Sequence, residues 1–277
     1  MTSGAGAHLL SVEEIRRGLE TTRIGRRIVV LPETDSTNTH ALNLAWESGG
    51  GSTDGTIVFA EFQSAGRGRL GRQWLSPRGA GLHMTILLIE DGAPFSHARL
   101  MMISAIAARN GIEKATDVEP IIRWPNDLYV GHRKLCGILI ETRLLANQKL
   151  AIALGIGVNC LQQAAHFPPE LRGKATSLEI ESSQPIDRNH VARCILQSLD
   201  GLLAPTKKTD DEIIASEWRR HSGDIGARVT LTEGGSTWMG QILDVHPATG
   251  LLVQLDTGAR RHFDAATTSR ACLELGT

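Results

Sequence analysis

Up to residue 222, apolar positions along the chain follow two different periods. Spacings of three and four residues are typical of helices with one buried face. They predict helices over 11–20, 96–110, 188–203 and 210–221. A further helix is expected to follow the N-cap residues 35–38 and to stop at the glycines 49–51. Short, nearly continuous apolar runs predict strands over 27–31, 56–62, 82–89, 121–124, 135–144 and 150–158, with a hairpin-like reversal over 129–134. Helices and strands therefore intermix in this region.

Beyond Gly223 the pattern changes to short alternating segments separated by turns that contain glycine or proline. We expect strands at 229–232, 238–245, 251–255, 260–263 and 268–273. Five short strands within about 50 residues favour a small β-barrel. The chain is therefore expected to divide into a short N-terminal segment (1–26), a main domain (27–222) and a C-terminal β-barrel domain (223–277).

Composition narrows the class of protein. Hydrophobic residues make up 41% of the chain, which is ordinary for a globular protein with a buried core. The 29 basic and 30 acidic residues leave a net charge of −1, which argues against a protein that coats DNA or an anionic membrane. We find no run as long as a membrane span and no secretory signal. The cysteines are far apart and favour free thiols in the cytoplasm: Cys136, Cys160, Cys194 and Cys272.

A loop rich in glycine and arginine, 66–74, is the first candidate for chemistry. Its opening Gly-Arg-Gly-Arg-Leu-Gly has the GxGxxG spacing of dinucleotide-binding proteins, but that fingerprint needs a helix beginning within it, and no helical period follows. Glycines let backbone amides approach an anion, and the guanidinium groups of Arg67, Arg69 and Arg72 could grip phosphate or carboxylate oxygens. A solvated basic loop is the alternative, because 23 of the 29 basic residues are arginine.

Two further strings carry candidate residues. The string Arg-Trp-Pro-Asn-Asp at 123–127 precedes Lys134, which opens an apolar strand whose Gly137 would let a ligand lie against the backbone. Lys134 could neutralise a carboxylate or phosphate there; the alternative is a turn followed by a surface lysine. The string Gly-Ile-Gly-Val-Asn at 155–159 again suggests close approach of another group, although Asn159 could instead be a buried structural residue.

The order of these strings is more specific than any one of them. The order is Asp35-Ser36-Thr37-Asn38, Gln63 to Arg69, Trp124 to Asp127, Lys134 to Glu141, and Gly155 to Asn159. As an ordered set they closely resemble the biotin protein ligases, over about residues 28–275. The resemblance implies an α+β fold in which a mixed β-sheet flanked by helices is followed by an SH3-like barrel.

The resemblance also implies a two-step reaction. Biotin and ATP would form biotinyl-5′-AMP and pyrophosphate, with Mg²⁺ on the phosphates. A lysine of the biotin carboxyl carrier protein or domain would then receive the biotinyl group. The chemistry suits the residues: serine, threonine and glutamine can satisfy the ureido ring, the apolar stretch 138–140 could hold the tail, and cations would offset the repulsion between carboxylate and polyphosphate.

Matching the motifs assigns roles to individual residues. Biotin would be held by Ser36, Thr37, Asn38, Gln63, Gly66, Arg67, Gly68, Arg69, Lys134, Gly137 and Gly157. ATP or the adenylate would be held by Arg69, Arg72, Trp74, Asn126, Asn159 and Arg270. Catalysis would rest on Lys134, Arg69, Arg72 and Arg123, and Asp127 is a candidate contact for Mg²⁺. The loop 66–74 would close over the adenylate and shield it from water.

Two departures from the family pattern and three alternatives remain. Arg123 stands where the family usually has lysine, and a guanidinium fork is not a point charge. Only about 30 residues precede the first matched strand, so we expect no winged helix-turn-helix and no DNA-binding role.

The alternative functions are a lipoate or octanoate ligase, a biotin-sensing regulator, and a biotin-binding protein without catalysis. The chain could be a monomer or a homodimer.

Overall fold

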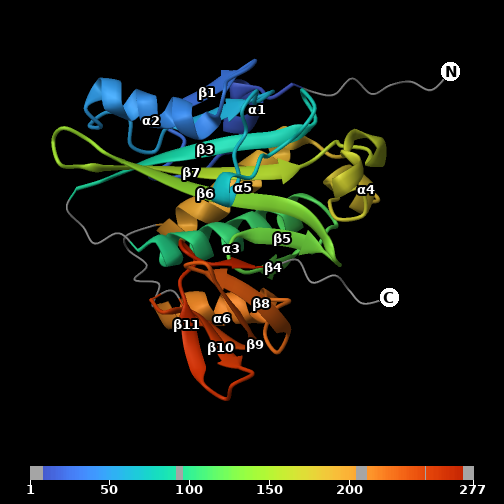
Figure 1. Ribbon diagram of the computed structural model, residues 1–277. Helices are drawn as coiled ribbons and strands as arrows, with labels where there is room; N and C mark the ends of the chain where they lie inside the picture. Colours follow the sequence, from blue (N-terminus) through green and yellow to red (C-terminus); the bar gives the residue numbers. More distant parts are fainter. Residues whose placement is uncertain (1–8, 92–95, 204–210, 247, 271–277) are drawn as a thin grey trace.

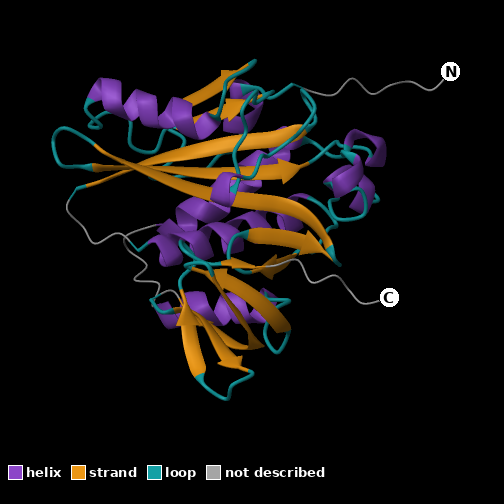
Figure 2. Ribbon diagram, viewed as in Figure 1, coloured by secondary structure: helices purple, strands orange, loops and turns teal. Residues whose placement is uncertain are grey.

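Two β-sheets and the helices packed on them make up the described part of the molecule (Figures 1 and 2). The computed structural model describes residues 9–91, 96–203, 211–246 and 248–270. The larger sheet has the strand order β1-β2-β3-β7-β6-β5-β4. Its strands are β1 (Ile28–Leu31), β2 (Ile57–Ala60), β3 (Gly81–Glu90), β4 (Ile121–Arg123), β5 (Asp127–Val130), β6 (Arg133–Leu144) and β7 (Leu150–Asn159). Only β1 and β2 pair in parallel, so the sheet is mixed, as expected.

Helices cover both faces of this sheet, because side chains alternate between the two faces along each strand (Figure 1). These helices are α2 (Thr37–Ser48), α3 (His97–Ala115) and α5 (Arg188–Leu203). On one face, Met84 and Ile156 belong to the large hydrophobic core that contains α3 and α5. On the other, Ala41 and Ala45 of α2 pack with small residues of β7 such as Ala153. The expected α+β architecture is confirmed.

α3 is longer than the apolar pattern predicts, because it continues past residue 110 to Ala115. Gly111 lies inside the helix, where glycine normally costs stability. A Cβ at this position would lie 2.5 Å from backbone atoms of Ile195 on α5. The glycine therefore permits a close approach of the two helices.

The smaller sheet is antiparallel with the strand order β11-β10-β9-β8-β12 (orange to red in Figure 1). Its strands are β8 (Arg228–Glu233), β9 (Ser236–His246), β10 (Gly250–Leu255), β11 (Arg260–Phe263) and β12 (Ser269–Arg270). The helix α6 (Asp211–His221) joins it to the rest of the molecule. Trp218 of α6 is fully buried in the same core cluster as Ile242 of β9, and Arg219 Nε lies 2.5 Å from Asp244 Oδ1. The second sheet therefore packs on the first domain.

The N-terminal segment has a shorter helix than expected. α1 (Val12–Arg16) begins at the N-cap Ser11, whose side chain accepts the backbone N–H of Glu14 in the first turn. It ends at residue 16 rather than near 20, and Gly18 follows with a left-handed φ of 75°. Ile15 and Ile24 are buried in the large core, so this segment packs on the main domain.

Short elements between β7 and α5 were not predicted, because three or four residues are too few to show a period. They are η2 (Ala164–His166), η3 (Pro169–Leu171) and α4 (Leu178–Glu181).

Residue 210, residues 271–273 of the expected last strand, and Cys272 lie outside the described residues. Cys136, Cys160 and Cys194 are free, and burial raises the pKa of the Cys160 thiol to about 12. Within the described ranges, no helix combines the length and apolar character needed to cross a membrane.

Candidate active site

One face of the large sheet is lined at its centre by small or polar residues and by Leu139. Residues that pair directly across strands share a face, and so do residues two apart on one strand. We call this surface the glycine face; its two rungs are Gly137–Gly157–His83 and Leu139–Gly155–Thr85, across β6, β7 and β3. The residues between these positions point to the opposite face and pack on α3 and α5.

The indole of Trp74 covers part of the glycine face. A Cβ on Gly157 would lie 2.8 Å from the indole Cε2, and a Cβ on Gly137 would lie 3.0 Å from Cζ3. Any larger side chain at Gly157 would therefore displace the ring. The buried indole N–H of Trp74 donates no hydrogen bond to the described residues. The two glycines thus provide a surface on which a flat or extended group can lie against the backbone.

A β-bulge brings Lys134 to the glycine face. The pairing of β5 with β6 shifts between Leu128 and Tyr129, which leaves Leu135 as an extra residue on β6. Such a residue changes which way the following side chains point. Leu135 is consequently buried in the core, while Lys134 Nζ lies 3.4 Å from the position of a Cβ on Gly137.

Lys134 has an anionic and an aromatic neighbour. Its Nζ lies 2.7 Å from Asp127 Oδ1 and 5.7 Å from the centroid of the Trp74 ring. The Lys134 side chain is 32% exposed, so the ammonium group is partly withdrawn from water. A charge in such a place interacts more strongly with an anion than a fully solvated lysine does. The surface-lysine alternative is therefore disfavoured.

The first turn of α2 places polar groups beside the glycine face. Ser36 is the buried N-cap of this helix, but its side chain makes no capping hydrogen bond. The backbone N–H and the hydroxyl of Thr37 both donate to Gln63 Oε1, at 2.8 and 3.0 Å. These bonds fix the orientation of the amide and turn its Nε2 group towards the loop that begins at Gly66.

Asn38 of α2 forms hydrogen bonds to two strands, β6 and β3, and lies close to a third, β7. Its Nδ2 donates to the carbonyl oxygen of Leu139 (3.2 Å) and to Glu141 Oε2 (2.8 Å), and its Oδ1 accepts from the hydroxyl of Thr85 (2.6 Å). A Cβ on Gly155 would lie 2.5 Å from Asn38 Oδ1. The amide is engaged entirely with protein groups, so Asn38 shapes the floor of the site.

The three loop arginines have different environments. Arg67 forms two hydrogen bonds to Glu141, at 3.1 and 2.9 Å. Arg69 reaches the second sheet, where its Nη2 donates to carbonyl oxygens before β12, including that of Thr268 (2.9 Å). Burial lowers the pKa of Arg69 from its ordinary value, and the nearby charge of Arg72 acts in the same direction. Arg72 itself is exposed.

Arg270 lies on β12 and pairs with the buried carboxylate of Asp224. Asp224 Oδ2 also accepts the backbone N–H of Trp124, at 2.6 Å. Arg270, expected at ATP, is thus placed behind the Trp-Pro-Asn-Asp string with its charge compensated by Asp224. Its contacts connect the second sheet to that string.

Three other predicted residues are held by their own neighbours. Asn126 and Asn159 are both buried; Asn126 Nδ2 donates to a carbonyl oxygen of β6 (2.7 Å), and Asn159 Nδ2 donates to the carbonyl oxygen of Thr176 (2.9 Å). Arg123 stacks on Tyr129, with 4.6 Å from its guanidinium carbon to the ring centroid. The two asparagines therefore support the backbone of the site.

Sequence reasoning missed two polar residues of the glycine face, His83 and Thr85. His83 is 2% exposed, and neither ring nitrogen forms a hydrogen bond within the described residues. Burial, assisted by the nearby Arg188, lowers the pKa of His83 to about 4, so the imidazole is neutral near pH 7. The available signal was two polar residues, two apart, in the otherwise apolar run 82–89.

The expectation that the apolar stretch 138–140 holds a ligand tail is wrong for two of its three residues. Ile138 and Ile140 belong to the core beneath α3 and α5. Leu139 alternates with them and shares the glycine face with Gly155. The period of the strand decides which side chains a ligand can reach.

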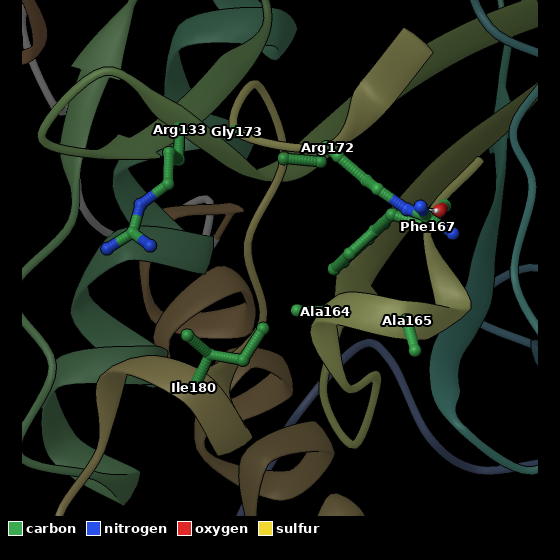
Figure 3. A pocket seen from close by; sticks show the side chains of 8 residues that line it. Arg133, Ala164, Ala165, Phe167, Arg172, Gly173 and Ile180 are labelled. Atoms are coloured by element: carbon green, nitrogen blue, oxygen red, sulfur yellow. Dashed lines mark hydrogen bonds between the residues drawn. The ribbon is translucent and has the colours of Figure 1, made fainter. Parts of the chain in front are cut away.

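A hollow of about 370 Å³ lies beside the start of β6 (Figure 3). It is mostly apolar, and it is lined by Arg133, Ala164, Ala165, Phe167, Arg172, Gly173, Ala175 and Ile180. The backbone N–H of Lys134 donates to the carbonyl oxygen of Lys174 (2.8 Å), which connects this region to the strand that carries Lys134. Over the residues described, no group of three or more histidine, cysteine, aspartate or glutamate side chains could hold a metal ion.

Comparison with known proteins finds similar sequences over most of the chain. The family model described as "Biotin/lipoate A/B protein ligase family" matches residues 30–159, which contain the glycine face and the loop. A bifunctional ligase/repressor BirA from Bacillus spizizenii is 32% identical, over 92% of this chain and 78% of its own length. A biotin–[acetyl-CoA-carboxylase] ligase from Mycobacterium tuberculosis is 30% identical, over 85% of each chain.

Solved structures give the same result. The biotin protein ligase from Aquifex aeolicus, in complex with biotin and ATP, superposes with a TM-score of 0.75 at 26% sequence identity. The match covers 89% of this chain and 100% of that one. Together, the ordered motifs, the glycine face and these matches show that the chain belongs to the biotin protein ligases of the biotin/lipoate A/B protein ligase family.

Proposed function

We propose that this protein is an ATP-dependent ligase that attaches biotin to a lysine of a biotin carboxyl carrier protein or domain. In the first step the carboxylate of biotin attacks the α-phosphate of ATP, which forms biotinyl-5′-AMP and releases pyrophosphate. In the second step the lysine amine attacks the acyl carbon of biotinyl-5′-AMP. An amide bond forms, the bond to the phosphate oxygen breaks and releases AMP, and the amine nitrogen loses one proton. The observation that carries this proposal is the glycine face, bounded by polar groups of α2 and by Lys134.

The glycine face suits the shape and polarity of biotin. A ureido ring has one carbonyl and two N–H groups, and Ser36, Thr37 and Gln63 offer hydroxyl and amide groups to satisfy them. The extended tail would lie over the backbone of Gly157 and Gly137 once the Trp74 indole, which covers these glycines, moves aside. The carboxylate would then end beside the ammonium group of Lys134.

Catalysis would come from positioning and electrostatics, since no side-chain nucleophile is needed. A carboxylate and a polyphosphate repel each other, and preorganised cations in a partly dry site reduce that repulsion. We assign Lys134 to the reacting carboxylate and α-phosphate, and Arg69 and Arg72 to the phosphates. Arg69 must exchange its carbonyl partners on the second sheet to do so.

Mg²⁺ would neutralise charge on the phosphates of ATP. This ion keeps several waters and usually binds through one or two carboxylates together with substrate phosphates. Asp127 offers one such carboxylate next to Lys134, which fits that requirement. We therefore propose Asp127 as the protein contact for Mg²⁺.

The hollow in Figure 3 is a candidate site for the nucleoside end of ATP. It has the apolar lining that a purine ring requires. Ala175, which lines the hollow, pairs with Lys134, so a base in the hollow would leave the phosphates near the ammonium group. Arg172 is tied to the carbonyl oxygen of Phe167 at 3.1 Å, which shapes one wall.

The direct test is to incubate the protein with ATP, Mg²⁺, biotin and a purified carrier domain, and to measure the mass of the carrier. We expect one biotinyl group per carrier, only when ATP is present. Equal modification from lipoate would support a lipoate ligase instead, and biotin binding without pyrophosphate release would support a sensor. Free cysteines and the need for ATP favour a cytoplasmic location.

A further inference from the structure

Glu141 connects three elements at the α2 end of the glycine face. It lies on β6 two residues beyond Leu139, so its side chain points to the same face. Its Oε1 accepts from Arg67 Nε (3.1 Å), while its Oε2 accepts from Arg67 Nη2 (2.9 Å) and Asn38 Nδ2 (2.8 Å). One carboxylate thus joins β6, the loop 66–74 and α2.

The pairing leaves the guanidinium of Arg67 facing the protein. Its Nη1 donates to the hydroxyl of Thr39 (3.0 Å), and its other donors are directed at Glu141. Paired, charge-assisted hydrogen bonds of this kind fix orientation as well as adding affinity. The Arg67 and Glu141 side chains are 39% and 30% exposed, so water weakens the pair without removing it.

We propose that Glu141 is a positioning residue that anchors the loop 66–74 to the glycine face and thereby determines the affinity for biotin. The proposal rests on the ligase function above. Glu141 acts through Arg67 and Asn38 and need not touch the substrate. The side chain of Arg67 anchors the loop, and the backbone groups of Arg67 stay available to bind biotin.

This anchor affects both walls of the biotin site. Without the carboxylate, Arg67 loses its anionic partner, and the loop that carries Trp74 is fixed at one fewer point. Asn38 also loses an acceptor, and its amide holds the hydroxyl of Thr85 on the floor. We therefore expect weaker biotin binding with a smaller change in the chemical step, because the reacting groups lie at the Lys134 end.

Steady-state kinetics of Glu141→Gln test the proposal, with pyrophosphate release as the readout. We expect KM for biotin to rise about tenfold, since one charged hydrogen-bonded pair is lost, while kcat changes less than about threefold. Glu141→Asp keeps the charge and should fall between Glu141→Gln and the wild type. An unchanged KM for biotin in Glu141→Gln would overturn the proposal.

A double-mutant cycle separates positioning from general damage. If Glu141 acts through Arg67, the combined Arg67→Gln and Glu141→Gln protein should have a KM for biotin close to that of the worse single variant. Effects that multiply would contradict the proposal. Asp256→Asn is the matched control, because it removes an exposed pair with Arg228 on the second sheet and should leave kinetics unchanged.

The wild-type assay keeps two failures distinct. A wild-type protein that modifies no carrier would overturn the ligase function itself. If the wild type modifies the carrier and Glu141→Gln has the same KM for biotin, only the proposed role of Glu141 would be overturned. Thermal unfolding of each variant shows whether it folds, and Glu141→Asp supplies the comparison if Glu141→Gln does not.

Discussion

The two faces of the large sheet use the same strands for different purposes. On β7, Leu154 and Ile156 face α3 and α5 and are buried in the large core, whereas Gly155 and Gly157 face Asn38 and Trp74. On the face that packs on α3 and α5, the side chains of the sheet fill the space. At Gly155 and Gly157 the backbone itself contacts the neighbouring groups, so a substrate can occupy the space that side chains would otherwise take.

The difference shows how a strand with period two can separate stability from function. Burial of large apolar side chains stabilises the fold on the helical face. The opposite face has such burial only where α2 packs on it, and around the glycines it carries polar and charged groups instead, including Lys134 and the buried His83. Substitutions on the two faces should therefore have different consequences.

The largest effect should come from the charged end of the glycine face. Removing one preorganised charge from such a site typically slows the reaction on the order of 100-fold to 1000-fold. We predict this loss for Lys134→Ala in biotin-dependent pyrophosphate release, with little change in the thermal unfolding temperature. A rate close to wild type would return Lys134 to the class of surface lysines.

His83 is a polar group of the glycine face for which we expect an effect on stability. The pKa of His83 is lowered to about 4, so the unfolded chain, with a pKa near 6.5, binds the proton more readily. Stability should therefore fall as the pH drops from about 6.5 towards 4, by on the order of 3 kcal/mol. The measurement is denaturant unfolding at several pH values, and His83→Gln should flatten the dependence. An equal pH dependence in both proteins would exclude His83 as its source.

Ile156→Val probes the helical face. Deleting one buried methyl group should destabilise the fold by about 1 kcal/mol, because the core relaxes only partly around the space. Urea unfolding measures this change. The KM for biotin and kcat should stay at wild-type values, and a shift in either would show that the two faces are not independent.

The smallest expected effect concerns the loop 66–74. Trypsin should cleave after Arg67, Arg69 or Arg72, and biotin with ATP should slow that cleavage several-fold if the loop closes over the adenylate. Peptide masses locate the cut. Cleavage that is insensitive to ligand would argue against closure.

The sequence predicts much of this arrangement because its signals are local. Glycines at 155 and 157 indicate close approach by another group, and the contacts of Asn38 and Trp74 confirm it. The identity of those groups could not be predicted, because both come from distant parts of the chain.

Other features depend on packing that leaves little local signal. The bulge at Leu135 follows from the register between β5 and β6. The strand expected to begin at residue 135 begins at Arg133, because the two residues before the bulge also pair with β5. Arg69 and Arg270 have partners set by the docking of the second sheet. The Glu141 anchor likewise joins residues that are 74 positions apart in the chain.

The central claim is that biotin binds on the glycine face, and one pair of neighbouring residues tests it most directly. Gly157→Val adds a side chain where a Cβ alone would lie 2.8 Å from the Trp74 ring, whereas Ile156→Val trims the opposite face. Titration calorimetry with biotin measures the affinity of each folded variant. We predict that Gly157→Val loses measurable biotin binding while Ile156→Val binds like the wild type. Wild-type affinity in Gly157→Val would contradict the claim.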